Sequence, residues 1–103
     1  MEELRGYLSK RKNKMSAWKK RFFCVINNSL NYYADDKLNK KKGEIQFSTI
    51  KSIEIEKNKK EDSKINIITE KRTFFLKAET GEEARKWVIY LNYMLNLFQI
   101  NNL

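Results

Sequence analysis

The residues of this chain best suited to chemistry are concentrated near its start, between Gly6 and Arg21. This stretch contains seven Lys and Arg side chains and no Asp or Glu. Because like charges on a short segment repel one another, folding alone gives little reason to gather them. An anionic partner would relieve the repulsion. The seven cations are Lys10, Arg11, Lys12, Lys14, Lys19, Lys20 and Arg21.

Strand periodicity groups three of these cations together. Side chains two residues apart in a strand share a face, so Lys10 lies on the face of Leu8. By the same rule, Lys19 and Arg21 lie on the face of Phe23. If the apolar members face the interior, the cations extend that face into solvent at the open end of a sheet or barrel. Such a cluster suits a multiply charged phosphate group. The alternative is a solvated basic hairpin without a specific ligand.

Composition limits the partners that this chain can attract. The 103 residues predict one domain with a single core, since 41% are hydrophobic and 13% aromatic. The formal net charge of +9 predicts attraction to nucleic acid, to an anionic membrane or to an acidic protein. No stretch reaches the roughly 20 apolar residues of a membrane span. The N-terminus has neither signal-peptide features nor the glycine that myristoylation needs. We therefore expect a cytoplasmic protein that meets a membrane from the water side.

Catalysis has little basis in this sequence. The chain has no histidine, which excludes Ser–His and Cys–His pairs. Its one cysteine, Cys24, lies among apolar residues of a predicted strand, so we expect a structural thiol and a reducing compartment. There is no glycine-rich phosphate loop and no cysteine cluster for zinc. We predict no enzyme activity, no catalytic or metal-binding residues and no cofactor.

The rest of the chain predicts the scaffold for the basic stretch. Short alternating or β-branched segments predict strands from about residue 4 to residue 78. The period changes at Thr80, which forms a capping box with Glu83 and predicts a helix over residues 81–98. Ala84, Trp87 and Leu91 then recur at helical spacing. The predicted strands are 4–12, 18–26, 30–34, 43–47, 50–57, 64–69 and 72–78.

Taken in order, these segments resemble a pleckstrin-homology (PH) domain over nearly the full chain, residues 1–103. The resemblance implies a mainly β fold: a seven-stranded, bent antiparallel barrel of two near-orthogonal sheets, capped by the C-terminal helix. It also implies that Trp87 lies in the core. The segments that carry the resemblance are Gly6–Lys10, Trp18–Phe23, Leu30–Tyr33, Gly43–Ile45, Phe74–Ala78 and the helix around Ala84, Trp87 and Leu91.

The resemblance also implies a binding site. Phosphoinositide-binding members use a lysine late in the first strand and a basic-x-Arg pair at the start of the second, which here are Lys10, Lys19 and Arg21. A third-strand tyrosine can add a hydroxyl contact, and Tyr32 occupies that position, although it could equally be an aromatic of the barrel wall. We expect Lys12 and Lys14 to support this headgroup site.

The loop after Lys10 has the length found in PH domains of oxysterol-binding, ceramide-transfer and four-phosphate-adaptor proteins, and Asn13 matches in place. Those domains recognise phosphatidylinositol 4-phosphate and insert an apolar wedge into the bilayer. Here Met15 is the apolar residue available as a wedge. We expect further membrane contacts from Arg11 and from the run Lys40, Lys41 and Lys42, which could otherwise be a solvated loop.

The sequence therefore predicts a monomeric phosphoinositide-binding module that is peripheral on the cytosolic face of a Golgi-type or plasma membrane. One alternative is a PH module that docks a protein partner without tight lipid binding. A less favoured alternative is a basic nucleic-acid-binding domain. Nucleic acid is not expected as a partner because most aromatic residues fall on apolar faces and the predicted helix is not a basic recognition helix.

Overall fold

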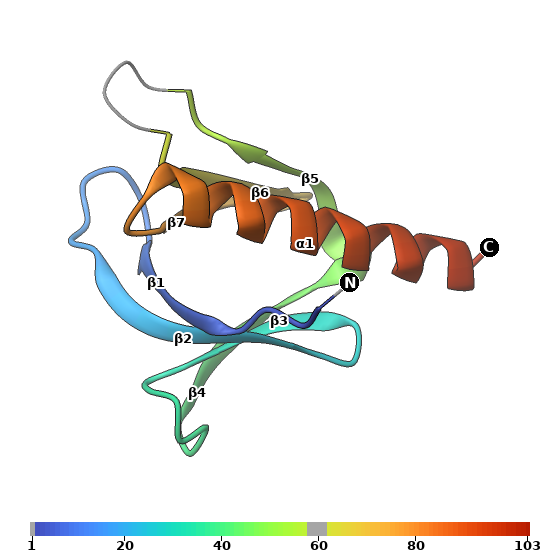
Figure 1. The fold of residues 1–103 in the computed structure, drawn as a ribbon, viewed down its shortest axis with the longest axis horizontal. Coiled ribbons are helices and arrows are strands. Elements are labelled where there is room, and N and C mark those ends of the chain that lie inside the picture. Colours follow the sequence, from blue (N-terminus) through green and yellow to red (C-terminus); the bar gives the residue numbers. More distant parts are fainter. Residues whose placement is uncertain (1, 58–61) are drawn as a thin grey trace.

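The computed structural model describes residues 2–57 and 62–103. These ranges contain seven strands, the short 3-10 helix η1 (Phe47–Thr49) and the long helix α1 (Gly81–Asn101). Figure 1 labels the strands and α1 along the chain. The strands are β1 (Gly6–Arg11), β2 (Lys19–Ile26), β3 (Ser29–Tyr33), β4 (Lys41–Gln46), β5 (Ile50–Ile55), β6 (Lys64–Thr69) and β7 (Thr73–Lys77).

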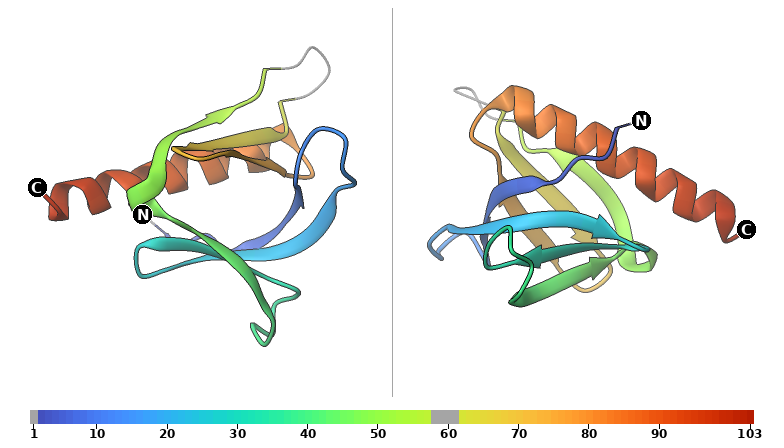
Figure 2. Two further views of the ribbon diagram at one scale, coloured as in Figure 1. Left: turned by 180° about the vertical axis from the view of Figure 1, so that it is seen from behind. Right: turned by 60° about the horizontal axis from the view of Figure 1, so that its bottom comes forward.

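The described strands form one antiparallel sheet in the order β4-β3-β2-β1-β7-β6-β5. The predicted fold class, mainly β with one C-terminal helix, is thereby confirmed. The resemblance implied two sheets, whereas here β1 pairs with β2 along one side and with β7 along the other. The sheet is therefore continuous through β1. Its β2–β4 half crosses its β6–β7 half in the right-hand view of Figure 2.

Alternating side chains explain why the sheet bends around one core. Most inward positions of the strands are apolar, and several are completely shielded from water, so their burial supplies most of the driving force for folding. The outward positions of the same strands carry most of the charge. Fully buried side chains on five different strands include Leu8, Phe23, Leu30, Ile65 and Leu76.

Helix α1 closes the core from one side by packing on β5 and β6. Thr80 is its N-cap, with Oγ1 accepting a hydrogen bond from the Glu83 backbone N–H at 3.1 Å. Trp87 is buried in the core, as predicted. The helix continues beyond the predicted end at Phe98 because no Gly or Pro stops it. No helix in the described ranges has both the length and the apolar character to cross a bilayer.

The main departure from the predicted strands is at β4, which begins at Lys41 rather than at Gly43. A register shift between Tyr32 and Tyr33 places Gly43 opposite Tyr32 and Lys41 opposite Tyr33. Lys42 is therefore the extra residue of a β-bulge, a feature that redirects side chains at the edge of a sheet. Elsewhere, predicted strand ends such as residues 4–5 and 56–57 lie outside the observed strands.

Candidate functional site

The β1–β2 hairpin places the three selected cations on one face. Lys10 lies directly opposite Lys19, and Leu8 lies directly opposite Arg21. Opposite residues in an antiparallel pair point to the same side of the sheet. Since Leu8 and Phe23 are buried on this side, the cations continue the inner face to the open end of the hairpin, as the alternation predicted.

These cations line a common hollow of about 360 Å³, which we call the basic cleft. Six of its lining residues are cationic, and none of the described lining residues is acidic. Four other hollows of similar size on the described surface each include at least one glutamate. The basic cleft therefore differs from them in electrostatics rather than in volume. It is lined by Lys10, Arg11, Lys12, Ser16, Ala17, Lys19, Arg21, Tyr32 and Lys42.

The surroundings of Lys10 disfavour its positive charge. Its burial lowers the pKa of the Lys10 ammonium, and the nearby charges of Arg72, Arg21 and Lys19 lower it further. Two aromatic faces partly offset this cost: Nζ lies 5.1 Å from the centroid of the Tyr32 ring and 5.7 Å from that of Phe74. A bound anion would relieve the like-charge repulsion at this position.

Tyr32 forms an aromatic wall of the basic cleft. Its ring lies 5.3 Å from that of Phe23, its neighbour across the β2–β3 pair. Burial raises the pKa of the Tyr32 hydroxyl, while the charges of Arg72 and Arg21 act in the opposite direction. The hydroxyl is therefore protonated near neutral pH and can donate a hydrogen bond to a phosphate oxygen.

Arg72 is a cation beside this site that the sequence prediction missed. It immediately precedes β7, and its guanidinium carbon lies 4.1 Å from the centroid of the Phe74 ring. Its charge acts on both Lys10 and Tyr32. The signal was present in the sequence, because Arg72 shares its strand face with Phe74 and Leu76, just as Lys10 shares its face with Leu8.

The other predicted site residues divide between the cleft and its surroundings. Lys12 lines the basic cleft. Lys42 also lines it, and as the extra residue of the bulge in β4 it has no residue opposite it in the β3–β4 pair. Lys14, predicted to support the headgroup, is not a lining residue, and its Nζ lies 3.9 Å from Glu56 Oε1. Lys40 is exposed outside the cleft.

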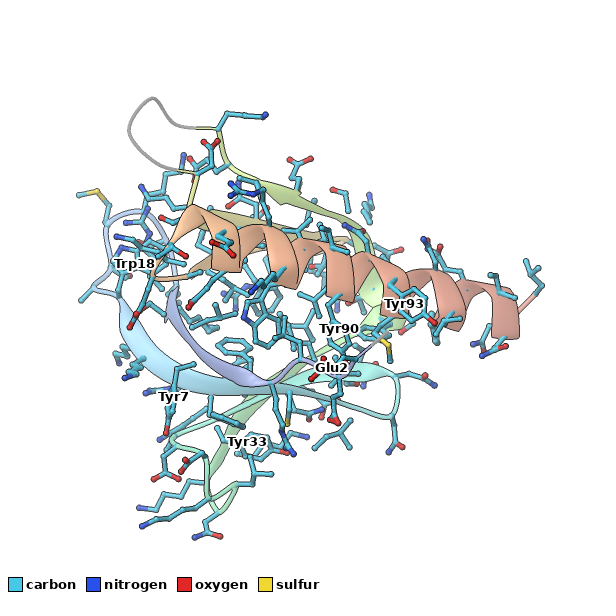
Figure 3. The ribbon with its side chains drawn as sticks, in the orientation of Figure 1. Glu2, Tyr7, Trp18, Tyr33, Tyr90 and Tyr93 are labelled. Carbon is cyan, nitrogen blue, oxygen red and sulfur yellow. The ribbon has the colours of Figure 1, made fainter. Side chains whose placement is uncertain are left out.

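Two more predicted membrane contacts are engaged within the protein. Lys41 Nζ donates to Glu44 Oε1 at 2.7 Å, and this hydrogen bond raises the pKa of Lys41. The guanidinium carbon of Arg11 lies 4.2 Å from the centroid of the Trp18 ring at the loop end of the hairpin, where Figure 3 labels Trp18.

Met15 is the most exposed large apolar side chain of the β1–β2 loop, with 95% of its surface accessible. Asn13 holds the loop next to it: Asn13 Oδ1 accepts hydrogen bonds from the Met15 backbone N–H at 2.9 Å and from Ser16 Oγ at 3.1 Å. This arrangement presents Met15 to solvent at the loop tip, where the sequence predicted a wedge.

Comparison with known proteins agrees with this architecture. The family model of the PH domain matches residues 2–96. The guanine exchange factor for Rac 30 of Dictyostelium discoideum is 34% identical over 95 residues, which cover 88% of this chain and 6% of the exchange factor. The chain thus spans a small part of that relative.

Solved structures show the same fold. The PH domain of human TBC1 domain family member 2 superposes with a TM-score of 0.80 at 26% identity, covering 96% of this chain and 85% of that chain. The C-terminal PH domain of pleckstrin, solved in complex with D-myo-Ins(1,2,3,5,6)P5, gives a TM-score of 0.75 at 23% identity, covering 89% and 93% of the two chains.

Proposed function

The chain belongs to the PH domain family, and we propose that it binds a phosphoinositide headgroup in the basic cleft and thereby attaches to an anionic membrane. One observation carries the proposal: six cations line the cleft, and none of the described lining residues is acidic. An inositol phosphate would supply the missing negative charge. The pleckstrin domain shows that this fold can hold such a ligand.

Five residues that line the cleft have distinct roles in this proposal. Lys10 and Lys19 face each other across the hairpin and contact phosphate oxygens from two strands. Arg21 adds a planar guanidinium that can hold two oxygens of one phosphate. The Tyr32 hydroxyl donates one further hydrogen bond, while Lys12 adds charge at the rim of the cleft.

Two cations outside the predicted trio extend the site. Lys42 lines the cleft from the bulge in β4, and Arg72 lies on the β7 side, where its charge already acts on Lys10. Cations on both sides of the trio favour a headgroup with more than one phosphate. The length of the β1–β2 loop and Asn13 resemble those of PH domains that recognise phosphatidylinositol 4-phosphate, and they favour this lipid. Its headgroup has a second phosphate where it joins the lipid.

The membrane contacts follow from the position of the β1–β2 loop. With Met15 fully accessible at the loop tip, shallow insertion of this side chain would place the basic cleft beside the headgroup layer. Lys14 and Lys40 then contribute as general charges, each worth about 1 kcal/mol near an anionic leaflet. We propose peripheral attachment to the cytosolic face of a Golgi-type or plasma membrane.

Vesicle titration tests the proposal directly. Vesicles are prepared with equal total negative charge, supplied by phosphatidylserine alone or with part replaced by phosphatidylinositol 4-phosphate or another phosphoinositide isomer, at an ionic strength of about 0.15 M. We expect phosphoinositide vesicles to bind at least about tenfold more tightly, the effect of one charge-assisted contact. Equal binding would reduce the interaction to unspecific electrostatics. Tighter binding to an oligonucleotide of equal charge would favour nucleic acid, and the lack of any vesicle binding would favour protein docking.

A further inference from the structure

We propose that Gly43 is a positioning residue of the basic cleft: its missing side chain gives the Tyr32 ring room to lie across β4 and point its hydroxyl at the headgroup. The inference rests on the proposed function, because it concerns the same cleft. It adds a residue that does not line the cleft and that neither the charge pattern nor the strand pattern selects.

The position of the Tyr32 ring carries the inference. Gly43 lies directly opposite Tyr32 in the β3–β4 pair, so a side chain at residue 43 would point to the same face. A Cβ atom built on Gly43 would lie 2.6 Å from Tyr32 Cζ and 3.1 Å from Cε2, and it would also overlap the hydroxyl oxygen. Tyr32 therefore occupies the volume that any other residue at this position would need.

Backbone conformation does not explain this glycine. No described glycine of the chain has a positive φ angle, so Gly43 adopts a backbone conformation that other residues can also adopt. Glycine inside a strand costs stability and commonly marks a site where another group approaches closely. Here the approaching group is the ring of Tyr32.

Two neighbours limit the movement of the ring. Phe23 packs against it from β2 with ring centroids 5.3 Å apart, and Lys10 Nζ lies over its face. A methyl group at residue 43 would therefore rotate the ring out of the cleft or push β4 away. Either movement removes the hydroxyl from the headgroup and takes the aromatic face away from Lys10.

A double-mutant cycle tests this inference, with Tyr32→Ala, Gly43→Ala and the double variant titrated against phosphatidylinositol 4-phosphate vesicles. We expect Tyr32→Ala and Gly43→Ala each to weaken binding roughly tenfold, the loss of one hydrogen bond to a charged group. In the Tyr32→Ala background, Gly43→Ala should cause no further loss, because the clash has been removed. Gly6→Ala is the matched control: Gly6 also lies in a strand, its added Cβ meets no atom within 4 Å, and binding should not change.

Unchanged binding by Gly43→Ala would overturn the inference, and so would a further loss in the double variant equal to the loss in the single one. If Gly43→Ala does not fold, folding of the double variant supports the clash with Tyr32, whereas failure of both to fold overturns it. If the wild type binds no phosphoinositide vesicle, the proposed function fails and the inference fails with it. A wild type that binds, with Gly43→Ala unchanged, overturns the inference alone.

Discussion

The first hairpin and the C-terminal helix differ in how their side chains interact. In α1, each local interaction favours the helix. Thr80 caps the first turn, and Glu82 Oε1 lies 3.8 Å from Lys86 Nζ one turn later. Trp87 is buried. In the β1–β2 hairpin, cations are brought together on one face, and Lys10 is partly buried among them. The interactions of the helix favour folding, whereas the cations of the hairpin repel one another on a shared face.

The contrast implies that stability and the proposed binding depend on different residues. A sequence that serves only folding would pair or disperse its charges, as Lys41 and Glu44 do on β4. The cleft cations are instead left to repel one another, a cost that the core and the helix offset. Substitutions in the two regions should therefore have separable effects.

The largest effect should follow from breaking the helix side. Trp87→Ala removes a side chain that is 4% exposed and should lower the free energy of unfolding by roughly 3–5 kcal/mol, because it leaves a cavity in the core. Chemical denaturation followed by circular dichroism measures this loss. Tyr93, which Figure 3 labels on the same helix, is 39% exposed. Tyr93→Ala should cost much less, and equal losses would show that the helix is not anchored through Trp87.

A smaller effect, on binding rather than on folding, should follow from breaking the hairpin side. Arg21→Ala should weaken phosphoinositide binding by roughly 1.5–3 kcal/mol and leave the unfolding midpoint nearly unchanged. Lys20→Ala is its matched control, because it removes the same charge from the preceding residue. Lys20 points to the opposite face of the hairpin, where its Nζ lies 4.6 Å from the centroid of the Tyr7 ring. Similar losses from both variants would mean that only net charge matters.

The sequence predicted more of the hairpin than of its surroundings. Alternation alone placed Lys10, Lys19 and Arg21 on one face, since the period of a strand fixes the direction of each side chain. The helix start was equally predictable, because Thr80 and Glu83 form a local signal. The predicted end at Phe98 was too early, because a helix without a stop signal can continue for as long as its neighbours allow.

What the sequence did not reveal depended on pairing between distant strands. The bulge that brings Lys42 to the cleft arises from the register of the β3–β4 pair. The close approach of the Tyr32 ring to Gly43 likewise depends on this pairing, which places the two residues opposite each other. Arg72 is distant from the hairpin in sequence, and the pairing of β1 with β7 brings its charge close to Lys10. Strand order and register are long-range properties that local patterns do not fix.

The helix cap offers a more modest test of the same contrast. Thr80→Ala removes the hydroxyl that accepts from the Glu83 backbone N–H and should cost about 1 kcal/mol of unfolding free energy. Vesicle binding by the folded variant should not change. Thr80→Ser retains the hydroxyl and should restore most of the stability. A binding defect in folded Thr80→Ala would contradict the separation of the two regions.

The smallest expected effect has the opposite sign. Because the pKa of Lys10 in the folded state lies below its usual value of 10.5, charged Lys10 opposes folding at neutral pH. Lys10→Met keeps the aliphatic stem and should raise the free energy of unfolding at pH 7, by less than about 1 kcal/mol owing to solvent screening. The gain should shrink as pH rises through the lowered pKa and vanish above 10.5, where wild-type Lys10 is neutral in both states.

Thermal unfolding at several pH values measures this difference, and vesicle binding by Lys10→Met should weaken at the same time. Lys12→Met is the control, since it removes an exposed charge nearby and should leave the unfolding midpoint unchanged. A wild type more stable than Lys10→Met at pH 7 would show that Lys10 contributes to the fold rather than opposing it.

A bound headgroup can be located directly by crystallography. In a crystal of the protein grown with inositol 1,4-bisphosphate, we expect phosphate oxygens within hydrogen-bond distance of Lys10, Lys19 and Arg21, with the ligand inside the basic cleft. A ligand held on the opposite face of the hairpin, between Lys20 and Lys77, would overturn the proposed function of the cleft, as would a ligand that contacts none of the three cations.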